Sequence, residues 1–239
     1  EYPMKTRFVH GLLWICLGSV SSLSSCHRGD SSSMTSSDAL PILGPMKLVP
    51  NDAGGLDTVF MSLPELVLED QTGQPFHSDS LRGQIRVVDF FFASCPGICV
   101  DMGANMAKIY ANQRVHQDSV QGVKAGPGLR FLSYTIDPNR DTREVLADYA
   151  VRHGVPAQSR DWLFLRGDEA SIHRLAEQYY LLSAGVDSTA PGGFLHSGQF
   201  LLLDPKGRIR GLYDGTSADE CKVLERDLDA LRREWSEEQ

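Results

Sequence analysis

The pattern of apolar and polar positions predicts a folded α/β domain built around one strongly apolar strand. Residues 87–92 combine β-branched and aromatic side chains and end at small residues, which predicts a buried central strand. Apolar positions at helical spacing follow and predict a helix over about 96–116, with Pro96 suited to its first turn. A strand, a short loop and a helix therefore form the central unit of the domain.

Further strands and helices flank this unit along the chain. In order, the pattern predicts a hairpin over 63–76, a strand over 129–136 beside the central one, a helix after 141, a strand over 162–165, a helix over 168–180, a hairpin over 199–213 and a final amphipathic helix capped by Thr216 or Ser217. Asp141, with Glu144 three residues later, fits a helix N-cap with a reciprocal acid. This alternation predicts the α/β fold class.

Composition and charge narrow the classes of partner. The chain has 239 residues, of which 41% are hydrophobic and 23% charged, as expected for one globular domain with tails. The net charge of -8 argues against nucleic acid as a partner, because phosphate binding needs a basic face. Five cysteines are too few for a disulfide scaffold, and their odd number means that not all can pair internally.

The first 26 residues predict an export signal. Basic residues at positions 5 and 7 precede an apolar stretch over 8–20 that is followed by small residues, the pattern of a secretory signal. The stretch is shorter than the ~20 apolar residues of a comfortable membrane span. Residues 23–26, Leu-Ser-Ser-Cys, resemble the lipobox of bacterial lipoproteins, in which the cysteine, here Cys26, carries the lipid. An uncleaved anchor helix is the alternative, and in both cases we expect a domain anchored on the periplasmic side of a membrane.

Residues 27–56 separate this signal from the domain. They are rich in Ser, Gly, Asp and Pro and show no sustained apolar period, which predicts a flexible tether. Thirty such residues span roughly 30 Å root-mean-square, enough for an anchored domain to meet a membrane-bound partner. The folded domain is then expected over 57–239.

Two cysteines, Cys95 and Cys99, flank a Pro-Gly break at the carboxyl end of the central strand. Open α/β sheets bind their ligands at this edge. With a helical turn starting at Pro96, residues four apart face the same way, and the helix start lowers the pKa of a cysteine. Two such thiolates can bind a soft metal such as Cu(I) or oxidise to a disulfide, and the residues alone leave both chemistries open.

Two further residues are candidates for this edge, and a third cysteine lies elsewhere in the domain. Asp137 ends the strand expected beside the cysteine strand, where a carboxylate can orient or protonate a site group; formation of an Asp-Pro turn explains it equally well. His196 follows a glycine-rich loop that lets the backbone approach other groups closely. Cys221 lies more than a hundred residues from the pair and is expected to be a packed or surface thiol.

Three motifs follow one another in the predicted domain. They are Cys-Pro-Gly-Ile-Cys over 95–99 after the apolar strand, Thr-Ile-Asp-Pro-Asn-Arg-Asp-Thr over 135–142, and His-Ser at 196–197 before Leu-Leu-Leu-Asp-Pro-Lys-Gly at 201–207. Over roughly 63–231 the chain resembles the Sco/SenC family of copper-handling, membrane-tethered, thioredoxin-like proteins. The resemblance implies a thioredoxin-like fold with one hairpin at the start and a second before the last helix.

The resemblance also implies a copper site and a partner. Cys95 and Cys99 would bind copper together with His196, and Asp137 would lie close by. The protein would deliver copper to the binuclear copper centre of cytochrome c oxidase, or to another extracytoplasmic cuproprotein, or would reduce that centre's cysteines in exchange with thiol-disulfide reductants. Two thiolates suit Cu(I), and an added imidazole allows Cu(II) to be held as well.

The sequence departs from the family pattern at two positions near these ligands. Val100 stands where a proline commonly follows the second cysteine, and Leu195 stands where an aspartate commonly precedes the histidine. The second departure removes a carboxylate that would support the imidazole, so it bears on Cu(II) affinity and redox poise more than on copper binding itself.

The metallochaperone hypothesis competes with two enzymatic ones on the same fold. In a thiol-disulfide oxidoreductase, Cys95 attacks or is attacked and Cys99 resolves the mixed disulfide. A thiol peroxidase is the weaker alternative, because the sequence offers no clear donor to polarise the peroxide. His196 discriminates between the first two hypotheses, since exchange needs two thiols but no distal imidazole.

Overall fold

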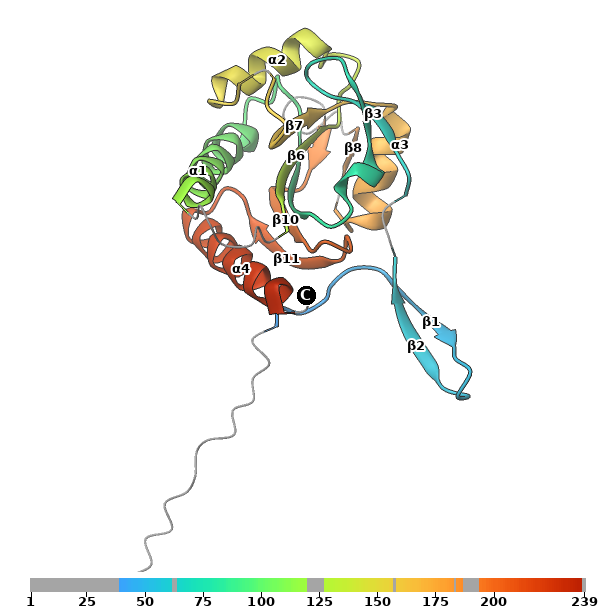
Figure 1. Ribbon diagram of the computed structural model, residues 1–239. Helices are drawn as coiled ribbons and strands as arrows, with labels where there is room; N and C mark the ends of the chain where they lie inside the picture. Colours follow the sequence, from blue (N-terminus) through green and yellow to red (C-terminus); the bar gives the residue numbers. More distant parts are fainter. Residues whose placement is uncertain are drawn as a thin grey trace, which may run out of the picture. The chain divides into compact units, whose positions relative to one another are not determined.

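The fold is organised by a five-stranded mixed sheet in the order β11-β10-β5-β6-β7 (Figure 1). The computed structural model describes residues 39–61, 64–119, 127–156, 158–182, 184–186 and 194–237. The strands of the sheet are β5 (Ile85–Phe91), β6 (Leu129–Thr135), β7 (Trp162–Leu165), β10 (Gln199–Leu203) and β11 (Ile209–Asp214). β5, β6 and β7 pair in parallel, whereas β10 is antiparallel to both β5 and β11. The predicted α/β class and the neighbouring positions of the strands 87–92 and 129–136 are confirmed.

Helices cover both faces of this sheet, because successive strand side chains point to opposite faces and both sets are apolar. On one face lie α1 (Ile98–Ser119) and α2 (Arg143–Arg152), and the ring of Tyr149 in α2 lies 4.7 Å from that of Phe91. On the other face α3 (Glu169–Arg174) continues into a π-helical turn, η2 (Leu175–Tyr179), and the next residue, Tyr180, lies 5.8 Å from Phe90. The last helix, α4 (Ala218–Glu237), runs beside α1 (Figure 1).

Both predicted hairpins are confirmed, with shorter strands in the first. β3 (Val67–Glu69) pairs antiparallel with β4 (Pro75–His77), and the 3-10 turn η1 (Ser78–Leu81) leads from there into β5. Residue 63, the predicted start of this hairpin, lies outside the described part of the chain. β10 and β11 form the second hairpin.

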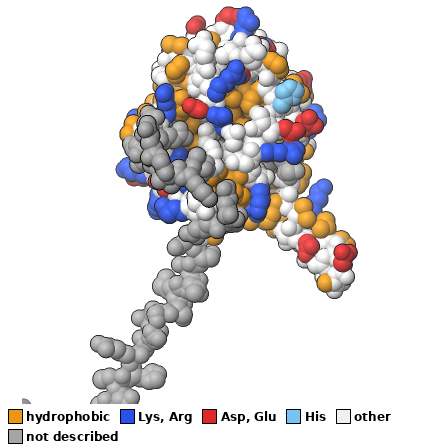
Figure 2. Space-filling view, in the orientation of Figure 1, with side chains coloured by type: hydrophobic (Ala, Val, Ile, Leu, Met, Phe, Trp, Pro, Cys, Tyr) orange, Lys and Arg blue, Asp and Glu red, His pale blue; other side chains and the backbone are white. Residues whose placement is uncertain are grey.

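A further hairpin lies within the segment predicted to be a tether. β1 (Met46–Pro50) pairs antiparallel with β2 (Leu56–Phe60) around Asn51, whose side-chain oxygen accepts the Gly55 N–H at 2.8 Å. The prediction of irregular chain over 27–56 is therefore wrong for residues 46–56, where the polar residues form a turn. Figure 2 shows apolar side chains along this hairpin, and Met46 and Leu48 are each 63% exposed.

The chain before this hairpin is held against the domain from residue 40 onward. The Leu43 N–H donates to the Ile209 carbonyl at 2.7 Å, which extends the sheet beyond β11 by a single bridge. The buried guanidinium of Arg210 donates to the carbonyls of Leu40 and Pro41. Residues 40–43 are thus part of the domain, while the predicted signal, Cys26 and residues 27–38 lie outside the described residues.

Of the helices described, none combines the length and apolar character that crossing a bilayer requires.

Two of the predicted helix starts change in the structure. α2 is capped by Thr142, whose hydroxyl accepts the Val145 N–H at 3.4 Å, so the prediction of Asp141 as the N-cap is wrong. α1 begins at Ile98 and not at 96. For α4, the hydroxyl of Ser217 accepts the Glu220 N–H at 3.3 Å, which confirms one of the two predicted caps.

The close approach of α1 and α2 requires a glycine at position 103. A Cβ placed on Gly103 would lie 2.3 Å from Nε2 of His153, at the end of α2. The imidazole cannot easily retreat, because its Nδ1 is 2.9 Å from the Tyr149 carbonyl oxygen and its ring lies 4.3 Å from the Tyr149 ring. The glycine therefore lets the histidine fix one helix against the other.

We expect Gly103→Ala to lower the free energy of unfolding by about 1–3 kcal/mol, the usual cost of overpacking. In an exposed helix the same change stabilises by about 1 kcal/mol, so the sign of the effect is diagnostic. Urea unfolding of Gly103→Ala, His153→Ala and the double variant measures it. In the His153→Ala background the added methyl should no longer destabilise, and a stabilised single variant would contradict the packing described.

Candidate functional site

Cys95 and Cys99 lie where β5 passes into α1. The Cys95 N–H donates to the Phe92 carbonyl at 3.1 Å, which closes a turn at the end of the strand. Cys99 sits in the first turn of α1 and is 3% exposed, whereas Cys95 is half-buried. Because α1 begins at Ile98, the two cysteines do not share a helical turn as predicted. Both carry thiols, and their side chains are joined by a hydrogen bond.

The electrostatics of Cys99 differ from the prediction of two low-pKa thiolates. Burial raises the pKa of the Cys99 thiol, and the hydrogen bond with Cys95 acts in the same direction. A hydrogen bond with the Phe92 backbone opposes this shift but is the smaller effect. In the metal-free protein Cys99 therefore keeps its proton, and a cation at the sulfur would favour the thiolate.

A third buried ionisable group, Asp89, lies in the middle of β5 and was missed by the sequence analysis. Its Oδ1 accepts the Ser133 hydroxyl at 2.5 Å, and the Ser133 oxygen accepts the Trp162 Nε1–H at 2.9 Å. Burial raises the pKa of Asp89 to about 7, and its charge contributes to the raised pKa of Cys99. The sequence did contain a signal, because Asp89 is an acidic residue inside the otherwise apolar run 87–92. A carboxylate in a buried strand needs a hydrogen-bond partner, which marks the position as unusual.

The two aspartates after β6 have different surroundings. Asp137 is buried, as expected at this edge, and its carboxylate pairs with Nε of Arg140 at 2.9 Å. Asp141 is 1% exposed and its Oδ2 accepts the Ala93 N–H at 3.0 Å and the Thr135 hydroxyl. Burial raises the pKa of Asp141, and these two hydrogen bonds oppose the shift. Asp141, and not Asp137, thus has a direct bond to the turn that leads into Cys95.

His196 is the last residue of a short strand. β9 (Phe194–His196) pairs antiparallel with β8 (Ala184–Val186), and His196 lies opposite Ala184. The side chain of His196 is outside the described part of the structure, and so are residues 187–193. Two residues later the backbone meets α1, because a Cβ placed on Gly198 would lie 3.4 Å from Cδ1 of Ile98. The segment that carries His196 therefore reaches the helical turn that carries Cys99.

Among the side chains that the structure describes, no group of three or more histidine, cysteine or acidic residues is placed to hold a metal. The predicted set of Cys95, Cys99 and His196 includes one side chain that is not described, so it stays a prediction. Cys221 is buried in the first turn of α4, as expected for a packed thiol, with Sγ 3.9 Å from the Gly215 carbonyl oxygen. Burial raises the pKa of Cys221 to about 11.

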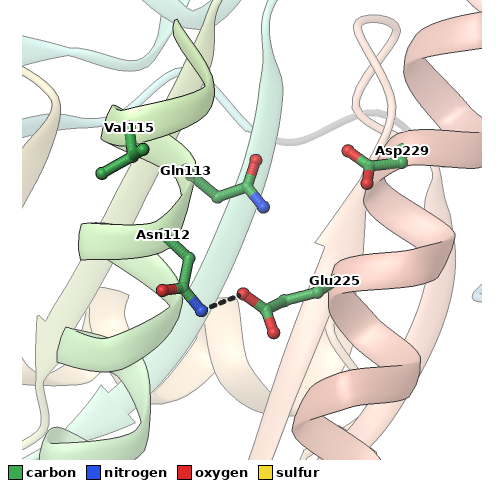
Figure 3. Close-up of a pocket in the computed structure, with 5 residues that line it drawn as sticks. All are labelled: Asn112, Gln113, Val115, Glu225 and Asp229. Carbon is green, nitrogen blue, oxygen red and sulfur yellow. Dashed lines mark hydrogen bonds between the residues drawn. The ribbon is translucent and has the colours of Figure 1, made fainter. Parts of the chain in front are cut away.

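A polar groove between α1 and α4 is separate from the thiols (Figure 3). It has a volume of about 320 Å³ and is lined by Asn112, Gln113, Val115, Glu225 and Asp229. Nδ2 of Asn112 donates to Glu225 across it at 2.8 Å. Asn112 follows Cys99 by thirteen helical residues, which corresponds to about 20 Å along α1. The groove is therefore not part of the thiol site.

Comparison with known proteins identifies the family. The SCO1/SenC family model matches residues 63–230. This chain belongs to the SCO1/SenC family. An SCO2-like protein of Rickettsia typhi is 32% identical to this SCO1/SenC chain over 157 residues, which cover 64% of this chain and 70% of the relative.

Solved structures confirm the thioredoxin-like fold of this SCO1/SenC protein. BsSco, described as a member of the Sco family of cytochrome c oxidase assembly proteins, matches with a TM-score of 0.60 at 20% identity, over 73% of this chain and 95% of its own. Bradyrhizobium japonicum ScoI with copper bound matches with a TM-score of 0.54 at 20% identity, over 70% of this chain and 99% of its own.

The buried carboxyl of Asp89 predicts a specific pH dependence of stability. Its folded pKa of about 7 exceeds the unfolded value of 3.8, so its contribution to stability is present below about pH 4 and is lost as the pH rises through 7. The free energy of unfolding of Asp89→Asn, relative to that of the unsubstituted protein, should therefore increase by about 2–3 kcal/mol from pH 5 to pH 8. Urea unfolding of the reduced, metal-free protein at both pH values checks this. Asp148→Asn, at an exposed position of α2, should show no such gain, and an equal gain in both variants would contradict the assignment.

Proposed function

We propose that this SCO1/SenC protein binds copper through Cys95, Cys99 and His196 and transfers it to a cuproprotein outside the cytoplasm. One observation carries the proposal: two hydrogen-bonded thiols lie at the carboxyl end of the central strand, and the segment with His196 packs on the same helical turn. Membership of a family in which a copper-bound structure is known supports it further.

The chemistry of the two sulfurs favours Cu(I) as the cargo. Thiolates are soft ligands, and a bound cation offsets the cost of ionising the buried Cys99. Copper binding therefore releases the thiol proton, and its affinity should rise with pH until the thiols are ionised. Transfer proceeds by ligand exchange, in which an acceptor thiol or imidazole replaces one ligand at a time. Cys95, the more exposed of the two sulfurs, is the first to be replaced.

The acceptor in this proposal is the binuclear copper centre of cytochrome c oxidase. Support comes from the family, since the relative BsSco is described as one of the cytochrome c oxidase assembly proteins. Anaerobic mixing of the Cu(I)-loaded protein with the copper-free oxidase subunit tests this step, with appearance of the binuclear spectrum as the expected result. Absence of transfer to that subunit would count against this acceptor without affecting the copper site.

Each thiol should be necessary for tight copper binding. We expect Cys95→Ser and Cys99→Ser each to weaken Cu(I) binding at least 100-fold, because one thiolate remains. Anaerobic titration of the reduced protein against a chromophoric Cu(I) chelator measures the affinity. Cys221→Ser is the matched control and should bind one copper at unchanged affinity, since Cys221 is packed at the start of α4. Retention of the original affinity in either single variant of the pair would exclude the two-thiol site.

His196 should matter for Cu(II) more than for Cu(I). We expect His196→Ala to abolish the absorption of the thiolate-Cu(II) complex, because Cu(II) needs the harder imidazole ligand. The same variant should keep its Cu(I) affinity within about tenfold and should still form the Cys95–Cys99 disulfide. Visible spectroscopy after Cu(II) addition and the chelator titration give the two values. An unchanged Cu(II) spectrum would remove His196 from the ligand set.

A thiol-disulfide oxidoreductase is the second candidate function. Its supporting observation is the asymmetry of the pair, because a half-buried Cys95 can attack while a buried Cys99, hydrogen-bonded to it, can resolve. Catalytic reduction of insulin disulfides by the copper-free protein would favour this candidate. A protein that is inactive in that assay and holds one copper per chain favours delivery.

A further inference from the structure

The turn that presents Cys95 is held from a distant part of the chain. The Phe92 carbonyl accepts the Cys95 N–H at 3.1 Å, and Ala93 is one of the two residues inside the turn. The pairing of β5 with β6 ends at Phe91 and Thr135, so the sheet ladder does not extend to the Ala93 N–H. Its acceptor is the Asp141 carboxylate, 48 residues away in sequence, at 3.0 Å.

The Asp141 carboxylate is itself fixed by the loop that follows β6. The oxygen that accepts the Ala93 N–H also accepts the Thr135 hydroxyl. The Thr135 oxygen accepts the Asp137 N–H at 3.1 Å, and the Asp141 N–H donates to the Asp137 carbonyl at 2.9 Å. A buried network whose members are all hydrogen-bonded is rigid, so the position of Ala93 is determined by residues 135–141.

Helix capping does not account for the burial of Asp141. Thr142 caps α2, and Asp141 is 1% exposed, whereas a capping aspartate commonly lies at the surface. Placing a carboxylate in the interior costs free energy that must be offset by specific bonds. Here one of those bonds leads to the turn that carries Cys95. Within this turn the Phe92 carbonyl accepts the Cys95 N–H, and the Phe92 backbone is also hydrogen-bonded to the Cys99 thiol.

We propose that Asp141 is the positioning residue of the thiol pair, which fixes the turn over 92–95 through the Ala93 N–H and so sets how the two sulfurs face each other. It acts through the backbone of Ala93, and Thr135 holds its carboxylate in place. The inference rests on the proposed use of Cys95 and Cys99 as the working pair. It applies equally to copper binding and to disulfide exchange.

The test is the dithiol-disulfide equilibrium of the copper-free full-length chain in glutathione buffers. One oxidised glutathione takes two electrons from the pair, so that the Cys95–Cys99 disulfide and two reduced glutathione molecules form. Peptide-resolved mass spectrometry after alkylation gives the equilibrium constant and the alkylation rate of Cys95. We expect Asp141→Ala to change the equilibrium constant at least tenfold and the Cys95 rate at least fivefold.

Two further variants separate positioning from general destabilisation. Asp141→Asn keeps an oxygen that can accept both hydrogen bonds and should restore both values to within threefold of the unsubstituted protein. Thr142→Ala removes the α2 cap next to Asp141 and should leave both values within twofold, although it destabilises the fold. An Asn variant that behaves like the Ala variant would contradict a role through the Ala93 hydrogen bond.

The proposal is overturned if folded Asp141→Ala keeps both values within twofold. If that variant does not fold, Thr135→Val, which removes the hydroxyl bound to the carboxylate, replaces it: a shift of threefold or more supports the proposal and a shift below twofold overturns it. Cu(I) titration of the unsubstituted protein is a separate measurement. A chain that binds no copper but whose thiol equilibrium depends on Asp141 refutes the copper function alone.

Discussion

The parallel pairing of β5 with β6 is the constraint on which the site depends. It runs from Ile85 opposite Leu129 to Phe91 opposite Thr135, so both strands end at the same edge. All seven residues of β5 are buried, and both faces of the sheet are covered by helices. A shift of one residue would exchange the faces of every side chain in the strand, so the register is strongly specified. The turn after β5 and the loop after β6 therefore meet in one arrangement.

β5 and the first turn of α1 each place an ionisable group in a dry environment. Asp89 and Cys99 are both buried, and burial raises the pKa of each of them. Burial disfavours the charged form of each group, so without a cation nearby each of them tends to keep its proton. A soft cation between two sulfurs replaces the thiol protons and supplies the missing positive charge. In the proposed copper site, the bound cation thus offsets the cost of ionising the buried Cys99 thiol.

The sequence predicted the local elements of this fold well and its cross-chain contacts less well. The apolar run at 87–92 and the spacing of the cysteines are local signals, so the central strand and the thiol edge followed directly. Asp141 was misread because a capping aspartate and a buried acceptor have the same sequence context, Asp-Thr before a helix. The β1–β2 hairpin was missed because the polar segment 51–55 was interpreted as unpatterned chain and not as a turn. The family was identified from the combination of three motifs, over 95–99, 135–142 and 196–207. Because these motifs are far apart in sequence, no local pattern predicts that they lie together.

The histidine and the thiols stand on elements of different rigidity. Cys95 and Cys99 belong to a buried strand end and a long helix, whereas His196 ends a two-stranded sheet that is separate from the central one. Two-stranded sheets are marginally stable on their own, so this one depends on its ends. Leu182 is buried before β8, and after β9 the Gly215 N–H donates to the Gly198 carbonyl at 2.7 Å. Just before Leu182, Leu181 adopts the left-handed backbone conformation, with φ of 55°. In the proposed site the two sulfurs are therefore preorganised, whereas His196 stands on the less stable element, an arrangement that suits the proposed binding and release of copper.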